Sequence, residues 1–218
     1  MKTWPELRFP VDYTKAVWKP ESWPAENEAS EMPAFISHYI NQLAGHCSSM
    51  SLLSVSSGEL KEIASIHPCT IKKIENYYAV DGNPKNLRNI NLDFPGAEII
   101  KIVHASICSL VHINMGLPQM DLIYSIKNIN YINTPIAKYF IKVCFDLLKV
   151  SGKIIIANFV PSFLQQDYMS VFADWKPCFR VGQSLDQLLG HLGSDKYSMN
   201  SFWDAAGNRF YLEITKTN

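Results

Sequence analysis

Two short stretches of the chain carry residues that could bind a nucleoside. Leu52–Ile63 (LLSVSSGELKEI) and Tyr77–Leu87 (YYAVDGNPKNL) each contain a short apolar run that is broken by a small or acidic residue and followed by a helix-like pattern. Gly58 lies where the first run should turn into its helix, and Asp81 lies where the second run should end. A backbone without side chains suits close approach by a ligand, and a carboxylate ~20 residues further on can accept hydrogen bonds from ribose hydroxyls. We therefore interpret Gly58 and Asp81 as two sides of a nucleoside-cofactor pocket.

Further polar side chains follow two later apolar runs. Asn128, Asn130 and Tyr131 follow the first of these runs, and Asn158 with Tyr168 follows the second. Buried amides and phenols need hydrogen-bond partners, so these side chains either orient a ligand or bond to the backbone. Both interpretations stay open.

Arg180 is the basic residue that could hold a carboxylate of the substrate or cofactor by a bidentate pair. The alternative for Arg180 is an ion pair with Asp174 or Asp186. The sequence shows no Asp–His pair near these positions that would serve as a general base.

Composition restricts the class of protein. The 218 residues are 47% hydrophobic and 18% charged, which predicts one folded domain with a small appendage. Twenty basic and twenty acidic residues leave no net charge, which argues weakly against a nucleic-acid partner. The five cysteines have no metal-ligand spacing, and we expect free thiols and a metal-free site. Without a signal-peptide pattern or a long apolar run, we expect a soluble cytoplasmic protein with no membrane partner.

Apolar runs alternate with helix-like patterns from Met50 onward. This alternation predicts an α/β fold, with a doubly wound, mostly parallel, seven-stranded sheet and a C-terminal antiparallel strand pair. The expected strands are Met50–Val55, Ile74–Val80, Glu98–Val103, Asp121–Ser125, Lys153–Phe159, Ser198–Trp203 and Arg209–Thr215, the last two joined by a turn at Ala206–Asn208. The expected helices are Glu59–Ser65, Pro84–Leu92, Thr134–Leu148, Phe163–Asp174 and Leu185–Leu192.

Residues 1–49 form the expected appendage. Residues 1–30 contain four prolines and three tryptophans, which predicts an aromatic arm rather than a long helix. A helix is expected over Glu31–Leu43 with Ser30 as its N-cap. That helix is either a lid over the pocket or a permanent brace on the sheet. If it is a lid, Tyr39 and, more weakly, His38 could reach the substrate.

Several of these segments resemble class I S-adenosylmethionine-dependent methyltransferases. The shared stretches are LSVSSGELKEI, AVDGNPKNL, DLIYSIKNINYI, LLKVSGKIIIANFVPS, YM at residues 168–169, DW at residues 174–175, Arg180 and DAAGNRFYLEITK. The resemblance covers roughly Met50 to Lys216. It is closest to bacterial small-molecule methyltransferases that make methyl esters of hydroxylated fatty acids as cell-density signals.

The resemblance implies a role for each candidate residue, with S-adenosylmethionine as the cofactor. Residues 56–58 would approach its methionine part, Asp81 and Gly82 its ribose, and residues 105 and 106 its adenine. The implied cofactor-binding set is Ser56, Ser57, Gly58, Asp81, Gly82, Ala105, Ser106 and Ser125. The implied catalytic set is Asn130, Tyr168 and Asn158. The implied substrate-binding set is Asn128, Tyr131, Arg180 and Tyr39.

Structural alternatives exist for several of these residues. The turn at Gly58 could be an ordinary strand-to-helix turn, and Asp81 could cap a helix. His104 and Tyr124 could be structural. The sequence also departs from the family, because Ser56 and Ser57 replace an expected glycine and cysteine, and Asn130 stands where aspartate is usual.

The implied activity is metal-free, in-line methyl transfer to a small-molecule carboxylate or amine. Aligning the acceptor, methyl carbon and sulfur would be the main task of such a site. An alternative is cyclisation of the cofactor to azetidine-2-carboxylate with release of methylthioadenosine. A third possibility is a non-catalytic module of the same fold that binds a partner protein.

Overall fold

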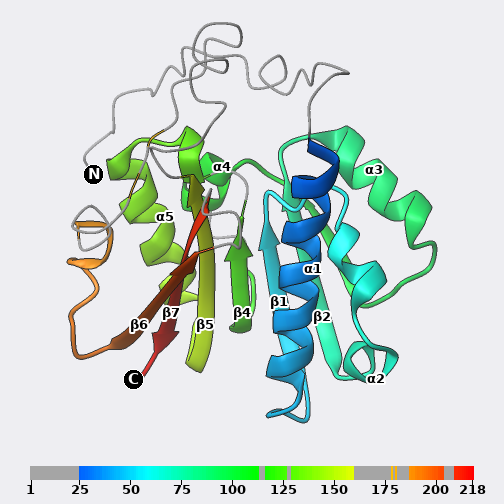
Figure 1. Cartoon of the computed structure of the whole chain (residues 1–218), viewed down its shortest axis with the longest axis horizontal. Helices are drawn as coiled ribbons and strands as arrows, with labels where there is room; N and C mark the ends of the chain where they lie inside the picture. The colour runs from blue at the N-terminus through cyan, green and yellow to red at the C-terminus, as the bar shows by residue number, and fades with distance from the viewer. Residues whose placement is uncertain are drawn as a thin grey trace, which may run out of the picture.

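One mixed sheet forms the centre of the molecule. The computed structural model describes residues 25–112, 116–126, 129–159, 178, 180, 187–203 and 209–218. The strands are β1 (Met50–Val55), β2 (Ile74–Asp81), β3 (Ile100–His104), β4 (Met120–Ser125), β5 (Leu148–Phe159), β6 (Tyr197–Trp203) and β7 (Arg209–Lys216). Their order is β3-β2-β1-β4-β5-β7-β6, and β7 runs antiparallel to both of its neighbours (Figure 1). The predicted fold class is therefore confirmed, and the strand order reverses between β1 and β4.

Helices cover both faces of this sheet. They are α1 (Ala25–Ala44), α2 (Pro68–Ile71), α3 (Pro84–Asp93), α4 (Ile107–His112) and α5 (Thr134–Asp146), with 3-10 turns η1 (Lys61–Ser65) and η2 (Ile129–Tyr131). Apolar residues of α1 and α3 pack on one face, and those of α4 and α5 pack on the other. Asn83 and Asn133 begin α3 and α5 by accepting backbone N–H groups, and a proline follows in each first turn. No described helix is long and apolar enough to span a bilayer.

The N-terminal helix is longer than predicted and packs on the sheet. It begins at Ala25, so the expectation of Ser30 as its N-cap was wrong, and it continues through Pro33. Ile36 and Ile40 are fully buried against the sheet. The ring of Phe35 lies 4.6 Å from that of Tyr211 on β7. This packing favours a brace, but lid and brace both stay predictions, and residues 1–24 lie outside the described part.

The boundary between α5 and β5 also differs from the prediction. The helix ends at Asp146 and β5 already begins at Leu148, so the stretch at residues 150–152 belongs to the strand. Ser151 has a left-handed backbone (φ 65°) there. A Cβ at Gly152 would lie 2.8 Å from a carbonyl oxygen of Met120 on β4, so the close approach of the two strands requires glycine. Residues 149–152, which lie between the predicted helix and the predicted strand, therefore form an irregular part of β5, where its register with β4 shifts.

Other predictions had mixed outcomes. The predicted helix at Glu59–Ser65 is the 3-10 turn η1, whereas α2, α4 and η2 were not predicted. Of the predicted helix Leu185–Leu192, residues 187–189 are helical in the structure. The predicted helix at 163–174 and the turn at 206–208 lie outside the described residues.

Candidate functional site

The turn after β1 has an unusual backbone. Its left-handed residues are Ser56 (φ 59°), Gly58 (φ 59°) and Leu60 (φ 51°). Because left-handed geometry costs an ordinary residue ~1–2 kcal/mol, Ser56 and Leu60 carry strain that Gly58 avoids. The N–H of Ser57 donates to the carbonyl of Val80 at 3.0 Å, which joins the turn to the end of β2. The predicted strand-to-helix turn at Gly58 is thus a fixed structure at the carboxyl edge of the sheet.

Asp81 is bound closely to the same turn. One of its carboxylate oxygens accepts the N–H of Gly58 at 2.8 Å, and the other accepts the N–H of Asn83 at 2.7 Å and the side-chain amide of Asn86 at 3.3 Å. Asp81 is only 7% exposed. The helix cap of α3 is Asn83, which accepts the N–H of Lys85, so Asp81 is not the capping residue. A carboxylate offers about four lone-pair sites, so Asp81 retains capacity to accept a further hydroxyl.

The ends of β2 and β3 bring the next group of predicted residues together. The N–H of Ala105 donates to the carbonyl of Asp81 at 3.1 Å, and Gly82 packs against Ser106. The hydroxyl of Ser106 accepts the N–H of Ser109 at 3.0 Å, as an N-cap does, so this residue also has a structural role. Asp81, Gly82, Ala105 and Ser106 therefore form one contiguous surface at the carboxyl edge.

His104, next to this surface, is exposed, and its Nε2 lies 3.2 Å from the carbonyl oxygen of Gly82. This contact joins β3 to the loop after β2 and supports the structural interpretation of His104.

A small pocket lies between the ends of β1 and β4. The residues that line it are Pro33, Ser54, Val55, Ser56, Ser57, Glu62, Tyr124 and Ile126.

Ser125 is buried at the end of β4, and its hydroxyl has no hydrogen-bond partner among the described residues. An unsatisfied buried hydroxyl costs free energy, which marks Ser125 as a group that could receive a ligand.

Sequence reasoning missed Glu62, the carboxylate in this pocket. It is 3% exposed and accepts a hydrogen bond from the hydroxyl of Tyr124, whose oxygen lies 2.5 Å from that of Tyr77. Burial, followed by the charge of Glu62, raises the pKa of both phenols, so they remain hydrogen-bond donors. Tyr124 was expected in the core and is indeed buried.

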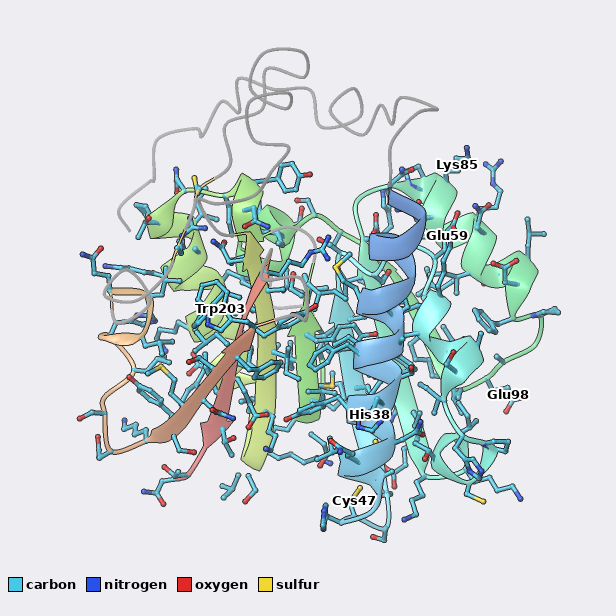
Figure 2. All side chains as sticks on the ribbon, viewed as in Figure 1. His38, Cys47, Glu59, Lys85, Glu98 and Trp203 are labelled. Atoms are coloured by element: carbon cyan, nitrogen blue, oxygen red, sulfur yellow. The ribbon has the colours of Figure 1, made fainter. Side chains whose placement is uncertain are left out.

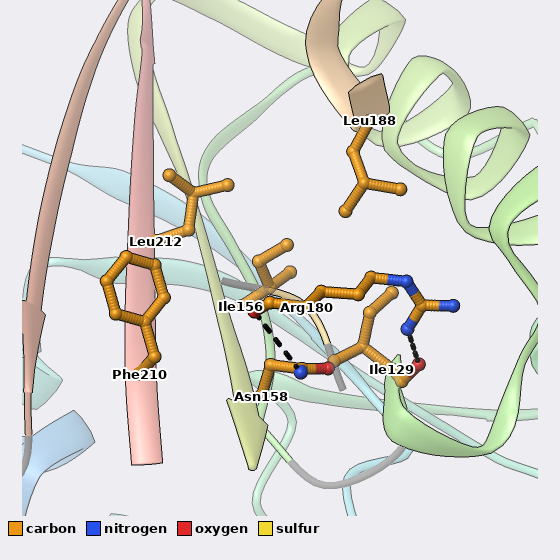
Figure 3. A pocket seen from close by; sticks show the side chains of 7 residues that line it. All are labelled: Ile129, Ile156, Asn158, Arg180, Leu188, Phe210 and Leu212. Carbon is orange, nitrogen blue, oxygen red and sulfur yellow. Dashed lines mark hydrogen bonds between the residues drawn. The ribbon is translucent and has the colours of Figure 1, made fainter. Parts of the chain in front are cut away.

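Beyond β4 and β5, Arg180 joins several polar groups. Its guanidinium donates to the carbonyl of Ile129 at 2.7 Å and to the carbonyl of Ile132, and the amide of Asn158 donates to its carbonyl at 3.4 Å. Figure 3 shows the guanidinium turned toward Ile129 in a small, mainly apolar pocket. The carbonyl of Asn130, on η2, accepts the N–H of Cys178 at 2.9 Å.

These contacts give Arg180 a structural role in the described residues, because it holds the turn that carries Asn130. Asn130 is 2% exposed, and burial raises the pKa of its neighbour Tyr131. The catalytic and substrate-binding roles of these residues stay predictions. Asn128 and Tyr168 lie outside the described residues, as do Asp174 and Asp186.

Tyr39 lies apart from the carboxyl edge. Its hydroxyl donates to Glu213 at 2.5 Å, and Lys153 binds the same carboxylate at 2.9 Å. Burial and this carboxylate raise the pKa of Tyr39 well above its usual range. Figure 2 shows His38 on the lower half of α1, likewise away from the strand ends. Within the described ranges, no three histidine, cysteine or acidic side chains gather as metal ligands.

The seven-stranded sheet with this strand order has the Rossmann-like fold found in methyltransferases. Solved structures agree. A possible exported protein from Bordetella parapertussis superposes with a TM-score of 0.70 at 14% identity, covering 94% of this chain and 78% of that one. Magnesium protoporphyrin IX methyltransferase from Synechocystis PCC 6803, with bound S-adenosylhomocysteine, gives 0.63 at 9% identity, covering 94% and 92%.

The N-methyltransferase NodS from Bradyrhizobium japonicum WM9 gives a TM-score of 0.59 at 8% identity, covering 89% of this chain and 99% of that one. The sequence matches no model of a known protein family and no curated protein. At these identities the similarity establishes the fold and nothing narrower.

Proposed function

We propose that this protein is an S-adenosylmethionine-dependent enzyme that transfers the methyl group to a small-molecule acceptor. The observation that carries the proposal is the contact between Asp81 and Gly58 at the carboxyl end of β1, the strand on one side of the point where the strand order reverses. In open α/β sheets, ligands bind beyond the carboxyl ends of the strands at such a point. The magnesium protoporphyrin IX methyltransferase structure, which has the same fold, contains bound S-adenosylhomocysteine, and this supports the choice of cofactor.

The residues present fit the cofactor in several ways. Asp81 offers free acceptor capacity for ribose hydroxyls, and the contiguous surface of Gly82, Ala105 and Ser106 would carry the adenine. The turn at residues 56–58 would lie against the amino-acid part. Ser125 has a buried hydroxyl ready for a polar group.

The bound cofactor would supply a methyl group on a sulfonium, and the neutral thioether S-adenosylhomocysteine would be the leaving group. The chain's own residues would then orient the acceptor in line and exclude water. Asn130 and Asn158 are buried amides that can fix an amine or a carboxylate without adding charge. An amine acceptor must lose a proton before or during transfer, whereas a carboxylate acceptor needs no base.

Product analysis by mass spectrometry tests the reaction. Purified protein is incubated with S-adenosylmethionine, first alone and then with panels of small amines and carboxylic acids. Methyl transfer predicts S-adenosylhomocysteine only when an acceptor is present. Methylthioadenosine formed without acceptor would replace the proposal by cyclisation or another cleavage at the γ-carbon.

A further inference from the structure

Glu62 is a buried carboxylate without a cationic partner in the described structure. It lies on η1, 3% exposed, and faces the pocket formed by the turn after β1 and the end of β4. No lysine, arginine or histidine of the described ranges forms an ion pair with it. Its hydrogen bonds come from phenols, directly from Tyr124 and, through Tyr124, from Tyr77.

Phenols hold this carboxylate in place but do not neutralise it. A buried carboxylate is costly unless a cation or several strong donors compensate its charge. The hydrogen bond from Tyr124 holds Glu62 at the wall of the pocket. Tyr124 and Tyr77 keep their protons, because burial and the charge of Glu62 raise the pKa of both phenols. The pocket therefore suits a positively charged group, which none of the residues that the structure describes supplies as an ion-pair partner.

The walls of the pocket restrict the size of that group. Ser56 and Ser57 line one side, with Pro33 of α1 and Ile126 beyond β4 on the others. A small ammonium group can donate up to three hydrogen bonds, to the carboxylate and to nearby oxygens, and so suits a narrow pocket of this kind. A carboxylate in the same place would be repelled by Glu62.

We propose that Glu62 is an ammonium-binding residue and that the pocket receives an aliphatic amine in its protonated form. The inference rests on the proposed function and deepens it, because it assigns the chemical class of the group that the pocket after β1 binds. Two sources offer this chemistry. The amine belongs either to the amino-acid part of S-adenosylmethionine or to a second, acceptor molecule.

Calorimetry with a charge-neutral variant tests the inference. Glu62→Gln keeps the size of the side chain and an acceptor for Tyr124, and removes the charge. Three probes are titrated into wild type and variant: S-adenosylhomocysteine, methylthioadenosine, which lacks the amino-acid part, and n-butylammonium chloride with S-adenosylhomocysteine present. Glu59→Gln is the matched control, because Glu59 lies three residues away at the same edge (Figure 2) and bonds to Asn89.

Either source gives a distinct result. If the cofactor supplies the amine, Glu62→Gln lowers the affinity for S-adenosylhomocysteine by ~10-fold or more, as loss of a charge-assisted hydrogen bond predicts. The affinity for methylthioadenosine stays unchanged. If an acceptor supplies it, S-adenosylhomocysteine binds equally and n-butylammonium binding falls by ~10-fold or more. Glu59→Gln should match wild type throughout.

Unchanged binding of every probe to a folded Glu62→Gln protein would overturn the inference and leave Glu62 as a structural partner of Tyr124. Failure of wild type to bind either nucleoside would overturn the proposed function instead. In that case n-butylammonium is titrated into the free protein. Binding of n-butylammonium to wild type that is lost in Glu62→Gln would still support the ammonium site. Absence of binding to wild type would contradict it.

Discussion

The carboxylate of Asp81 accepts the backbone N–H of Gly58 at 2.8 Å, which joins the carboxyl ends of β1 and β2. The two residues are 23 positions apart in the sequence. The contact fixes the strained turn at Ser56–Leu60 in the position where a ligand would approach the backbone. One side chain thus positions the turn and, in our account, also binds the ribose.

This double role predicts different effects for two substitutions of Asp81. Asp81→Asn keeps an acceptor oxygen for Gly58 and should remain folded, but should weaken S-adenosylhomocysteine by ~10-fold or more because a charge-assisted hydrogen bond contributes about 1.5–3 kcal/mol. Asp81→Ala should lower the affinity for S-adenosylhomocysteine at least as much and should also lower the melting temperature of the protein. Calorimetry and thermal denaturation measure both. Full affinity in folded Asp81→Asn would remove this residue from the site.

Ser56 offers a test of the backbone geometry. Its φ of 59° is strained for serine and free of strain for glycine, so glycine would stabilise the folded turn. The greater flexibility of glycine in the unfolded chain offsets part of this stabilisation. Ser56→Gly should therefore raise the free energy of unfolding by about 0.5–1 kcal/mol. Ser57→Gly is the control, because Ser57 is not left-handed and the substitution should destabilise. Urea denaturation distinguishes them, and a loss of stability in Ser56→Gly would contradict the described turn.

Amide hydrogen exchange tests whether α1 moves. Ile36 and Ile40 are fully buried on the sheet, so we expect amides of residues 36–44 to exchange equally with and without S-adenosylhomocysteine. Amides of the turn at residues 56–60 should slow when the ligand binds, because they would lie against it. Slower exchange across residues 36–44 as well would restore the interpretation of this helix as a lid.

Much of the sheet was predictable from the sequence, because alternating apolar runs and turn residues determine strands locally. The prediction for β1 is correct to the residue, and β4 differs by one residue at its start. The start of α1 was not predictable, because Ser30 and Pro33 have the types expected at a helix N-terminus. The structure instead includes both residues within a longer helix.

The site was only partly predictable, for a similar reason. Asp81 and Gly58 belong to a local pattern that the sequence displays. Glu62 looks like the solvent-facing residue of a short amphipathic helix, and its burial depends on Tyr124, 62 residues later. Such a contact exists only when the fold brings η1 to the end of β4. A glutamate three residues after another glutamate carries no sequence signal of this.

Asn130 and Tyr168 are predicted to orient the reacting group. Asn130 is 2% exposed on η2, beyond the end of β4, where its amide can fix an acceptor. Once an acceptor has been identified, Asn130→Ala and Tyr168→Phe should each lower kcat by ~10-fold or more while cofactor affinity changes far less. Steady-state kinetics and calorimetry separate the two effects. Normal kcat in the folded fraction of a less stable variant would make that residue structural.

The central claim is that the carboxyl edge of this sheet binds S-adenosylmethionine. Isothermal titration of S-adenosylhomocysteine into the wild-type protein, repeated with Asp81→Asn, measures this binding most directly. The account predicts one site per chain, with affinity that falls by ~10-fold or more in the variant. Absence of binding to folded wild-type protein would contradict it.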